Sequence, residues 1–288
     1  MSAIYDARMG SETPVAGGGG PMPASSLRRG LSEDIAIRGA WPDAVDRDWA
    51  WGGSTGRGAR VCLIDSGVDP EHPSVGPLSG SWAAEPSGDS IAVVEELPQD
   101  PCGHGTAAAG IVRSLAPECD LYSVRVLGAG NTGTGRALLT GLEWAIEQGF
   151  ELVNMSLATT RREFVAELHQ LADKAYFGGT LLVCSAHNMI MESYPWRFAA
   201  VVSVGSHEEP DPFTFFYNPR PPVEFYARGV DVEIPWAEKS VITATGNSFA
   251  APHITGISAL ILGKHPELTP FQLKSVLYMT AANVGMAA

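Results

Sequence analysis

Short apolar runs alternate with longer segments of mixed polarity along most of the chain. The apolar runs predict strands, and they span 60–64, 91–94, 121–126, 151–155, 180–185 and 200–205. The segments around them predict helices over 104–115, 135–148, 161–177, 248–263 and 269–281. Strands that alternate with helices form parallel sheets with crossover helices. The pattern therefore predicts an α/β fold with a mainly parallel central β-sheet flanked by helices.

Two of the helices carry clear local signals. The helix over 135–148 has one apolar face, because its apolar residues recur at the 3.6-residue period: Leu138, Leu139, Leu142, Ala145 and Ile146. The last helix begins with Thr269 followed by Pro270, which is typical of a capped start with proline in the first turn.

The N-terminal segment differs from the rest of the chain. Residues 1–30 carry little apolar surface and include four consecutive glycines, so they predict a flexible tail or a short propeptide. Apolar residues then recur at helical spacing between Ile35 and Trp51. Because no linker or internal repeat interrupts the chain from 35 to 284, residues 31–288 predict a single domain.

Composition excludes several classes of protein. The chain has 288 residues, 45% of them hydrophobic, and a net charge of -13. Phosphate binding needs clustered Lys and Arg, so neither nucleic acid nor an anionic membrane is expected as a partner. No run approaches the roughly 18 apolar residues of a membrane span, and residues 1–30 lack the apolar core of a secretory signal. These features favour a cytoplasmic protein.

The four cysteines indicate neither a disulfide framework nor a zinc site, because their spacing is irregular and no C-x-x-C pair occurs. Cys62 and Cys184 stand inside apolar strand-like runs, which suits buried reduced thiols. No metal and no cofactor is expected.

The segment 246–253 places Ser248 at the start of an apolar helix. Backbone N–H groups and the helix dipole favour a developing negative charge there. A serine hydroxyl becomes a nucleophile only with a neighbouring base. Taken alone, Ser248 is a helix N-cap, which is the default interpretation of a serine at this position.

Two upstream residues suit the partners of a nucleophilic serine. Asp65 directly follows the strand over 60–64, so it stands at the carboxyl end of a strand, where functional groups gather in parallel sheets. His104 lies between Gly103 and Gly105 in the first turn of a helix, and these small residues allow a close approach to another segment. Each has a plain alternative, a turn aspartate and a structural histidine.

Taken together, these segments resemble the subtilisin (subtilase) family of serine proteases over residues 58–284. Three blocks carry the resemblance: Ile64–Asp69, Gly103–Thr106 and Gly246–Pro252. Further matches are Leu121–Leu127, Val153–Leu157 and Ala259–Pro266. The resemblance implies a subtilisin-like three-layer fold and a serine endopeptidase that hydrolyses peptide bonds through an acyl-enzyme.

The resemblance also implies a role for each residue of the site. Ser248 is expected to be the nucleophile, His104 the general base and then acid, and Asp65 the carboxylate that orients the imidazole. Asn188 follows a buried strand and is expected to supply an oxyanion donor, with the backbone N–H of Ser248 as the second donor.

The substrate is expected to be a peptide or protein that binds in extended conformation, pairing with two segments of the chain. These segments consist of Gly130, Asn131, Thr132 and Gly133 on one side and Ser156, Leu157 and Ala158 on the other. The first could also be an ordinary polar loop. A short segment that contains Glu192 and Ser193 is expected to wall the pocket for the residue before the scissile bond. Glu192 favours a basic side chain there, unless it is an exposed carboxylate without a role.

Several positions depart from the family pattern. Ala107 stands in place of a second histidine, Asn247 in place of the threonine before the serine, and His187 in place of a glycine. Asn247 could donate to the oxyanion instead of the threonine, and His187 narrows the primary pocket or is a surface residue. Gly135 replaces a bulky aromatic residue, which predicts an open outer pocket.

The family's secreted members carry a calcium-binding loop that is missing after 111–115. Chelators are therefore expected to have little effect on this protein.

Four functions remain open from the sequence. The first is an active endopeptidase, and the second is a restricted-specificity maturation protease that removes leader peptides. The third is a peptide acyl-transferase, and the fourth is a catalytically silent subtilisin-fold binding protein. The presence of all three triad residues together with Asn188 counts against the fourth.

Overall fold

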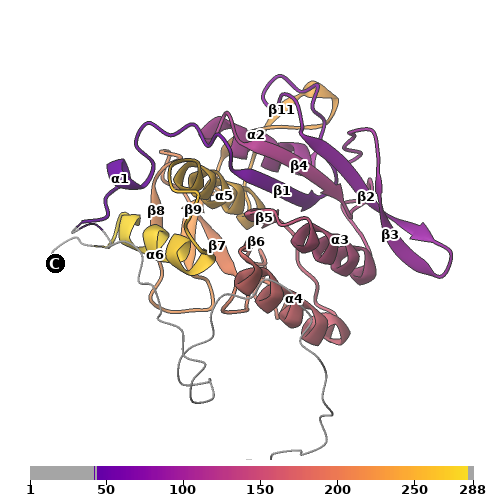
Figure 1. Cartoon of the computed structure of the whole chain (residues 1–288). Helices are drawn as coiled ribbons and strands as arrows, with labels where there is room; N and C mark the ends of the chain where they lie inside the picture. Colours follow the sequence, from indigo (N-terminus) through magenta and orange to yellow (C-terminus); the bar gives the residue numbers. More distant parts are fainter. Residues whose placement is uncertain (1–41, 43, 285–288) are drawn as a thin grey trace, which may run out of the picture. The chain divides into compact units, whose positions relative to one another are not determined.

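The computed structural model describes residue 42 and residues 44–284 of the chain (Figure 1). By its contacts the chain divides into two units, residues 1–44 and residues 45–288. Only the second unit is described below. The predicted tail over 1–30 and most of the helical pattern from Ile35 lie outside the described residues. The end of that pattern forms helix α1, Arg47–Trp51.

A nine-stranded sheet with the order β3-β2-β4-β1-β5-β6-β7-β9-β8 forms the centre of this unit. The seven inner strands run parallel, in the order β2, β4, β1, β5, β6, β7 and β9. The two edge strands, β3 and β8, run antiparallel to their neighbours. The bounds are β1 Arg60–Asp65, β2 Gly80–Ser87, β3 Ser90–Glu95, β4 Asp120–Arg125, β5 Leu152–Met155, β6 Leu181–Ser185, β7 Val202–His207, β8 Phe215–Tyr217 and β9 Phe225–Arg228. The predicted α/β class with a mainly parallel sheet is confirmed.

All six strands predicted from apolar runs are present, with ends within two residues of the expected ones. Strand β1 shows why such runs form central strands. Val61 and Leu63 belong to the hydrophobic core on one face of the sheet, and Cys62 and Ile64 belong to the core on the other face. A strand that is buried on both faces is apolar at every position. Cys62 and Cys184 are free and fully buried, as expected.

Helices cover both faces of the sheet (Figure 1). One core contains residues of α2 (His104–Leu115), α5 (Asn247–Lys264) and α6 (Pro270–Thr280). The other contains residues of α3 (Gly135–Glu147) and α4 (Val165–Gly178), which follows a short 3₁₀ turn, η2, over Arg162–Phe164. The sequence predicted each of these helices. The capped start at Thr269 is present as a full capping box with Gln272.

Helix α5 runs through the interior, and every residue from Phe249 to Leu262 is buried. A helix that is apolar all round is stable only when it is enclosed on all sides. Its first turn, which carries Ser248, is therefore fixed relative to the sheet by the burial of the rest of the helix.

A small two-stranded sheet lies beside α2. Strands β10 (Val232–Pro235) and β11 (Val241–Ala244) pair antiparallel and are joined through a short 3₁₀ turn, η3, over Ala237–Lys239. Val232 and Ile234 pack with Ala107 of α2 and Phe249 of α5 in a third apolar cluster. Among the described residues, no helix is both long enough and apolar enough to cross a bilayer.

Candidate active site

The carboxyl ends of three neighbouring parallel strands bring the predicted site residues together. Asp65 is the last residue of β1, Ser156 directly follows β5, and Asn188 comes three residues after β6. Strands β1, β5 and β6 are adjacent in the sheet and parallel, so their carboxyl ends share one edge. Ligands and reacting groups collect at this edge in open α/β sheets.

Asp65 and His104 form a buried pair. The Nδ1 atom of His104 lies 2.8 Å from Oδ1 of Asp65, and the two residues are 7% and 1% exposed. The same carboxylate oxygen accepts the backbone N–H of Ser66. Because an ionised carboxylate can only accept hydrogen bonds, Nδ1 of His104 carries the proton in this bond. In the neutral ring Nε2 is then the acceptor, which is the tautomer that a general base needs.

The two glycines around His104 are each required by the local backbone, one by a close approach and one by its conformation. A Cβ atom on Gly105 would lie 1.9 Å from the carbonyl oxygen of Gly67 and 3.2 Å from Cβ of Asp65. Gly103 has φ of +95°, a left-handed conformation that L side chains rarely adopt. The glycines thus allow the first turn of α2 to bring the imidazole against Asp65.

A second carboxylate, Asp100, holds the segment that leads into α2. Its Oδ1 accepts from Ser66 Oγ and from the backbone N–H groups of Cys102 and Gly103, at 2.8 to 3.0 Å. Its Oδ2 accepts from both the N–H and the hydroxyl of Thr106. A carboxylate is favoured at the amino end of a helix, where N–H groups lack partners. Asp100 was not identified from the sequence, although an aspartate four residues before a helical histidine was a usable signal.

The charges around His104 outweigh the effect of its burial. Burial alone lowers the pKa of a histidine, but the charge of Asp65, its hydrogen bond to Nδ1 and the charge of Asp100 raise it. The net result is that the pKa of His104 lies above its usual value of 6.5. A more basic imidazole is a better proton acceptor.

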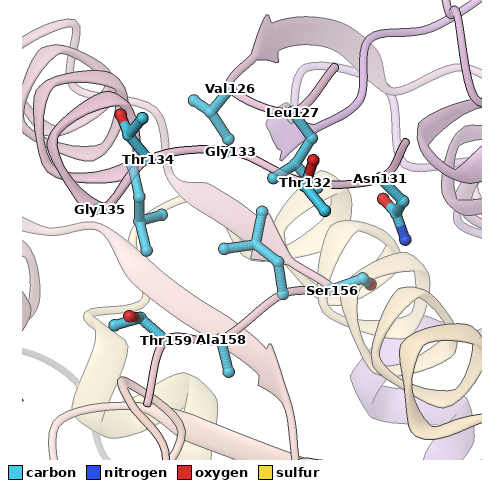
Figure 2. Close-up of a pocket in the computed structure, with 12 residues that line it drawn as sticks. Val126, Leu127, Asn131, Thr132, Gly133, Thr134, Gly135, Ser156, Ala158 and Thr159 are labelled. Carbon is cyan, nitrogen blue, oxygen red and sulfur yellow. The ribbon is translucent and has the colours of Figure 1, made fainter. Parts of the chain in front are cut away.

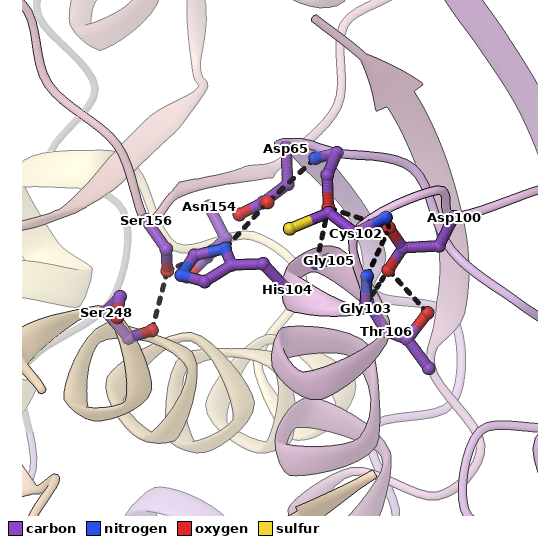
Figure 3. A network of polar contacts seen from close by, with 11 residues as sticks. Asp65, Asp100, Cys102, Gly103, His104, Gly105, Thr106, Asn154, Ser156 and Ser248 are labelled. Atoms are coloured by element: carbon purple, nitrogen blue, oxygen red, sulfur yellow. Dashed lines mark hydrogen bonds and ion pairs between the residues drawn. The ribbon is translucent and has the colours of Figure 1, made fainter. Parts of the chain in front are cut away.

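Ser248 lies on the other side of the imidazole from Asp65 (Figure 3). Its carbonyl accepts the hydroxyl of Ser156 at 2.8 Å, which ties the start of α5 to the end of β5. The ring centroids of His104 and Phe249 are 5.8 Å apart. Among the described residues, no hydrogen bond links Ser248 Oγ to His104 Nε2. Catalytic hydrogen bonds are often long without substrate and shorten in the complex.

Asn188 presents its amide nitrogen toward Ser248. A Cβ atom built on Gly246 would lie 3.3 Å from Ser248 Oγ and 3.6 Å from Asn188 Nδ2, so the hydroxyl and the amide nitrogen face the same small space. The backbone N–H of Asn247 holds the other end of the carboxamide, Oδ1, at 2.8 Å. This geometry allows Asn188 to act as an oxyanion donor.

The side chain of Asn247 is not free to donate to an oxyanion, contrary to the alternative considered from the sequence. Its Nδ2 donates to the carbonyls of Ala186 and His187, and its Oδ1 accepts both the N–H and the hydroxyl of Ser206. A carboxamide offers two donors and two acceptor positions. All four are occupied within the protein.

A cavity of about 340 Å³ runs along the predicted substrate groove (Figure 2). Six of the predicted substrate-binding residues line it: Asn131, Thr132, Gly133, Ser156, Leu157 and Ala158. Gly130 does not line this cavity and belongs to the turn beside it. Gly135 also lines the cavity, and a Cβ there would lie 2.0 Å from the ring of Phe164, so the position has no room for an aromatic side chain.

Glu192 and Ser193 do not line the cavity between 131–135 and 156–159. Glu192 lines a second cavity of about 540 Å³, and its carboxylate accepts from Arg162 at 2.7 Å and from the hydroxyl of Tyr194. Ser193 is fully buried, and its hydroxyl accepts the indole N–H of Trp196. Ser193 therefore supports the wall from within, and the charge of Glu192 is already compensated.

His187 lines the same second cavity. Its Nδ1 accepts the backbone N–H of Met189 at 3.0 Å, so the ring folds back onto its own loop.

Near the position after 111–115, where the calcium loop is missing, an arginine binds a group of backbone carbonyls. The guanidinium of Arg113 donates to the carbonyls of Val75, Pro77, Pro117 and Cys119 at 2.8 to 3.1 Å. Carbonyl oxygens of this kind are suitable calcium ligands, but here they face a permanent cation. The donor set at this position therefore does not fit a bound metal ion.

A buried Asp–His pair, a serine at the start of a helix and an amide donor at one edge of a parallel sheet are the groups that serine hydrolases use. Comparison with known proteins gives the family. The model of the subtilase family (Peptidase_S8) matches residues 56–288. The chain therefore belongs to the subtilase family, and it is a subtilisin-like serine endopeptidase.

Individual relatives agree with this assignment. Subtilisin DY of Bacillus licheniformis is 32% identical over 81% of this chain and 87% of its own length. The thermostable alkaline protease of Halalkalibacterium halodurans is 31% identical over 81% of this chain, and the match spans 64% of that longer protein. A cold-adapted subtilisin-like serine proteinase of known crystal structure matches with a TM-score of 0.64 at 24% identity, over 81% of this chain and 86% of that one. The last comparison supports the fold.

Proposed function

We propose that Ser248, His104 and Asp65 form the catalytic triad of this endopeptidase. The observation that carries the proposal is the 2.8 Å contact between His104 Nδ1 and Asp65 Oδ1, at the sheet edge that also holds the start of α5. The contact leaves Nε2 as the basic nitrogen on the side of Ser248. A carboxylate that orients the base, a base and a nucleophile are the parts that acyl transfer requires.

The chemistry proceeds in two halves. His104 Nε2 takes the proton of Ser248 as Oγ bonds to the substrate carbonyl carbon, and the carbonyl oxygen becomes an oxyanion. Asn188 Nδ2 and the N–H of Ser248 donate to that oxyanion. The C–N bond then breaks, and His104 gives its proton to the departing amine. Water repeats the sequence on the acyl-enzyme, which releases the acid and restores Ser248.

The substrate binds as an extended strand between 130–133 and 156–158. The cavity of about 340 Å³ between these segments supports this position, because its walls are short loop segments at the sheet edge. Thr159 and Tyr194 exchange two backbone hydrogen bonds of 2.9 Å, which fix the second segment against the wall behind it. The scissile bond then lies over Ser248.

The biological role that we propose is maturation by removal of leader peptides, in the cytoplasm. The support is the hydrogen bonding around the second cavity: Ser193 is buried behind its wall and bound to Trp196, and Glu192 is held by Arg162 and Tyr194. A pocket wall that is held in one arrangement adapts to few side chains, so it favours restricted specificity.

The test is a cleavage-site profile on a peptide library, with Ser248→Ala as the inactive control. Cleavage at one or a few sequence contexts by the wild-type protein alone supports a maturation protease. Broad cleavage contradicts restricted specificity but agrees with the endopeptidase activity. Product masses separate hydrolysis, which adds water, from acyl transfer to an amine, which does not. Equal cleavage by Ser248→Ala contradicts the triad.

A further inference from the structure

The side chain of Asn247 connects the segment after β6 to strand β7, next to the proposed oxyanion site. Its Nδ2 lies 3.2 and 3.3 Å from the carbonyl oxygens of Ala186 and His187, at the end of β6. Its Oδ1 lies 2.9 Å from both N and Oγ of Ser206, in β7. The orientation of the carboxamide is fixed by these partners, because carbonyls only accept and a backbone N–H only donates.

Asn188 needs such a support because its side chain is exposed. Among the described residues, its carboxamide makes one hydrogen bond, from the backbone N–H of Asn247 to Oδ1. An exposed side chain has several rotamers of similar free energy. The single bond at Oδ1 leaves Nδ2 as the free end, and this end faces the space next to Ser248 Oγ.

We propose that Asn247 is a positioning residue for the oxyanion donor Asn188, a role that rests on the proposed triad function. Its main chain selects which end of the Asn188 carboxamide faces the reacting carbonyl. Its side chain holds 186–187 in place, so that the backbone of Asn188 starts from a fixed point. Asn247 thus acts on the transition state through Asn188 and donates nothing to it directly.

The proposal separates the two parts of Asn247 experimentally. Every substitution except proline keeps the backbone N–H, so Asn247→Ala removes only the link between 186–187 and Ser206. A displacement of about 1 Å of a catalytic group can cost on the order of 100-fold in rate. We expect Asn247→Ala to lower kcat by about tenfold or more, with little change in KM, because an oxyanion contact is made only in the transition state.

A double-mutant cycle with Asn188→Ala distinguishes positioning from a general loss of structure. If Asn247 acts through Asn188, its replacement lowers kcat in the wild-type background and has almost no effect once Asn188 is alanine. Asn218→Ala is the matched control. Its carboxamide likewise bonds three backbone groups, of Arg220 and Val223, in a loop that takes no part in the proposed chemistry. Equal losses from Asn247→Ala in both backgrounds would overturn the proposal.

A measurement without catalysis tests the same link. Hydrogen exchange followed by mass spectrometry should show faster exchange at 186–189 in Asn247→Ala, and no change there in Asn218→Ala. Asn247→Thr serves if the alanine variant does not fold, because threonine cannot bridge both carbonyls and Ser206. Unchanged exchange contradicts the proposal. If exchange is faster in Asn247→Ala but the wild-type protein cleaves no peptide, the proposed function is contradicted, whereas the link from Asn247 to 186–187 is supported.

Discussion

Nδ1 of His104 and Oδ1 of Asp65 lie 2.8 Å apart at the end of β1, with both side chains almost fully buried. The contact joins residues 39 positions apart in the sequence. It exists because Gly105 allows α2 to pass within van der Waals contact of the strand end, and because Gly103 adopts the left-handed conformation that starts the helix. The same contact sets the tautomer of the imidazole and contributes to its raised pKa.

Replacing Asp65 by asparagine tests this contact. In another serine-protease fold such a change lowers kcat by about 10⁴, because the imidazole takes the wrong tautomer. The residual activity should also extend to lower pH. Burial lowers the pKa of His104, and the charge of Asp65 is the largest effect that opposes it. Profiles of kcat/KM against pH for the wild type, Asp65→Asn and the exposed control Asp89→Asn measure this. An acid limb at the same pH in Asp65→Asn would contradict the assignment.

The apolar runs of the sequence were sufficient to predict the central strands, because β1, β5 and β6 are buried almost throughout and β4 and β7 over much of their length. Strands β2, β8, β9, β10 and β11 were not predicted. Strand β2 alternates between buried and half-exposed positions, and it includes Pro86. Strand β10 packs against α2, which is far away in the sequence. Local patterns do not carry that information.

The residues of the site that stand in short local motifs could be predicted from the sequence. Asp65, His104 and Ser248 each stand in such a motif, and the sheet brings their segments to one edge. The partners of Asn247 were not predictable, because Ala186 follows β6 and Ser206 lies in β7, both distant in the sequence. For the same reason Ser193 was expected at the pocket wall, whereas it is buried and bound to Trp196.

His253 should make the protein less stable as the pH falls. Burial lowers the pKa of this residue to about 4, although its Nδ1 donates to the carbonyl of Phe249. Between about pH 6.5 and pH 4 the unfolded chain binds one proton more than the folded chain, so the free energy of unfolding falls with falling pH. Below about pH 4 this effect removes on the order of 3 kcal/mol from the free energy of unfolding.

The variant His253→Asn isolates this effect, because an asparagine can still donate to the carbonyl of Phe249 but does not titrate. Urea unfolding at several pH values should show a weaker pH dependence in the variant. His104 contributes with the opposite sign, since its raised pKa adds stability that is lost as the pH rises through it. Identical pH dependence in both proteins would exclude His253 as the source.

Arg113 should replace a metal ion as the stabilising cation between 75–77 and 117–119. Its four hydrogen bonds satisfy carbonyl oxygens that would otherwise lack a partner, so we expect Arg113→Ala to lower the free energy of unfolding by about 1–3 kcal/mol. A chelator should leave the Tm of the wild type unchanged. The control is Arg57→Ala, which removes an exposed ion pair with Glu118. A large fall of the wild-type Tm with chelator would contradict this account.

Arg162 should limit the effect of Glu192 on specificity. The carboxylate of Glu192 is neutralised by the guanidinium at 2.7 Å, so its attraction for a basic side chain is weakened. Arg162→Ala should raise kcat/KM for peptides with Lys before the scissile bond relative to peptides with Leu or Glu. Arg161→Ala is the neighbouring control, because Arg161 pairs with Glu163 instead. No change in relative preference would leave Glu192 without a role in specificity.

The central claim is that Ser248 is the nucleophile of a subtilisin-like endopeptidase. A fluorophosphonate reacts with a serine that an adjacent base activates, and peptide mass spectrometry locates the adduct. We predict one phosphonylated residue, Ser248, with labelling abolished in Ser248→Ala and strongly slowed in His104→Ala. An unlabelled folded wild-type protein, or an adduct on another residue, would contradict the claim.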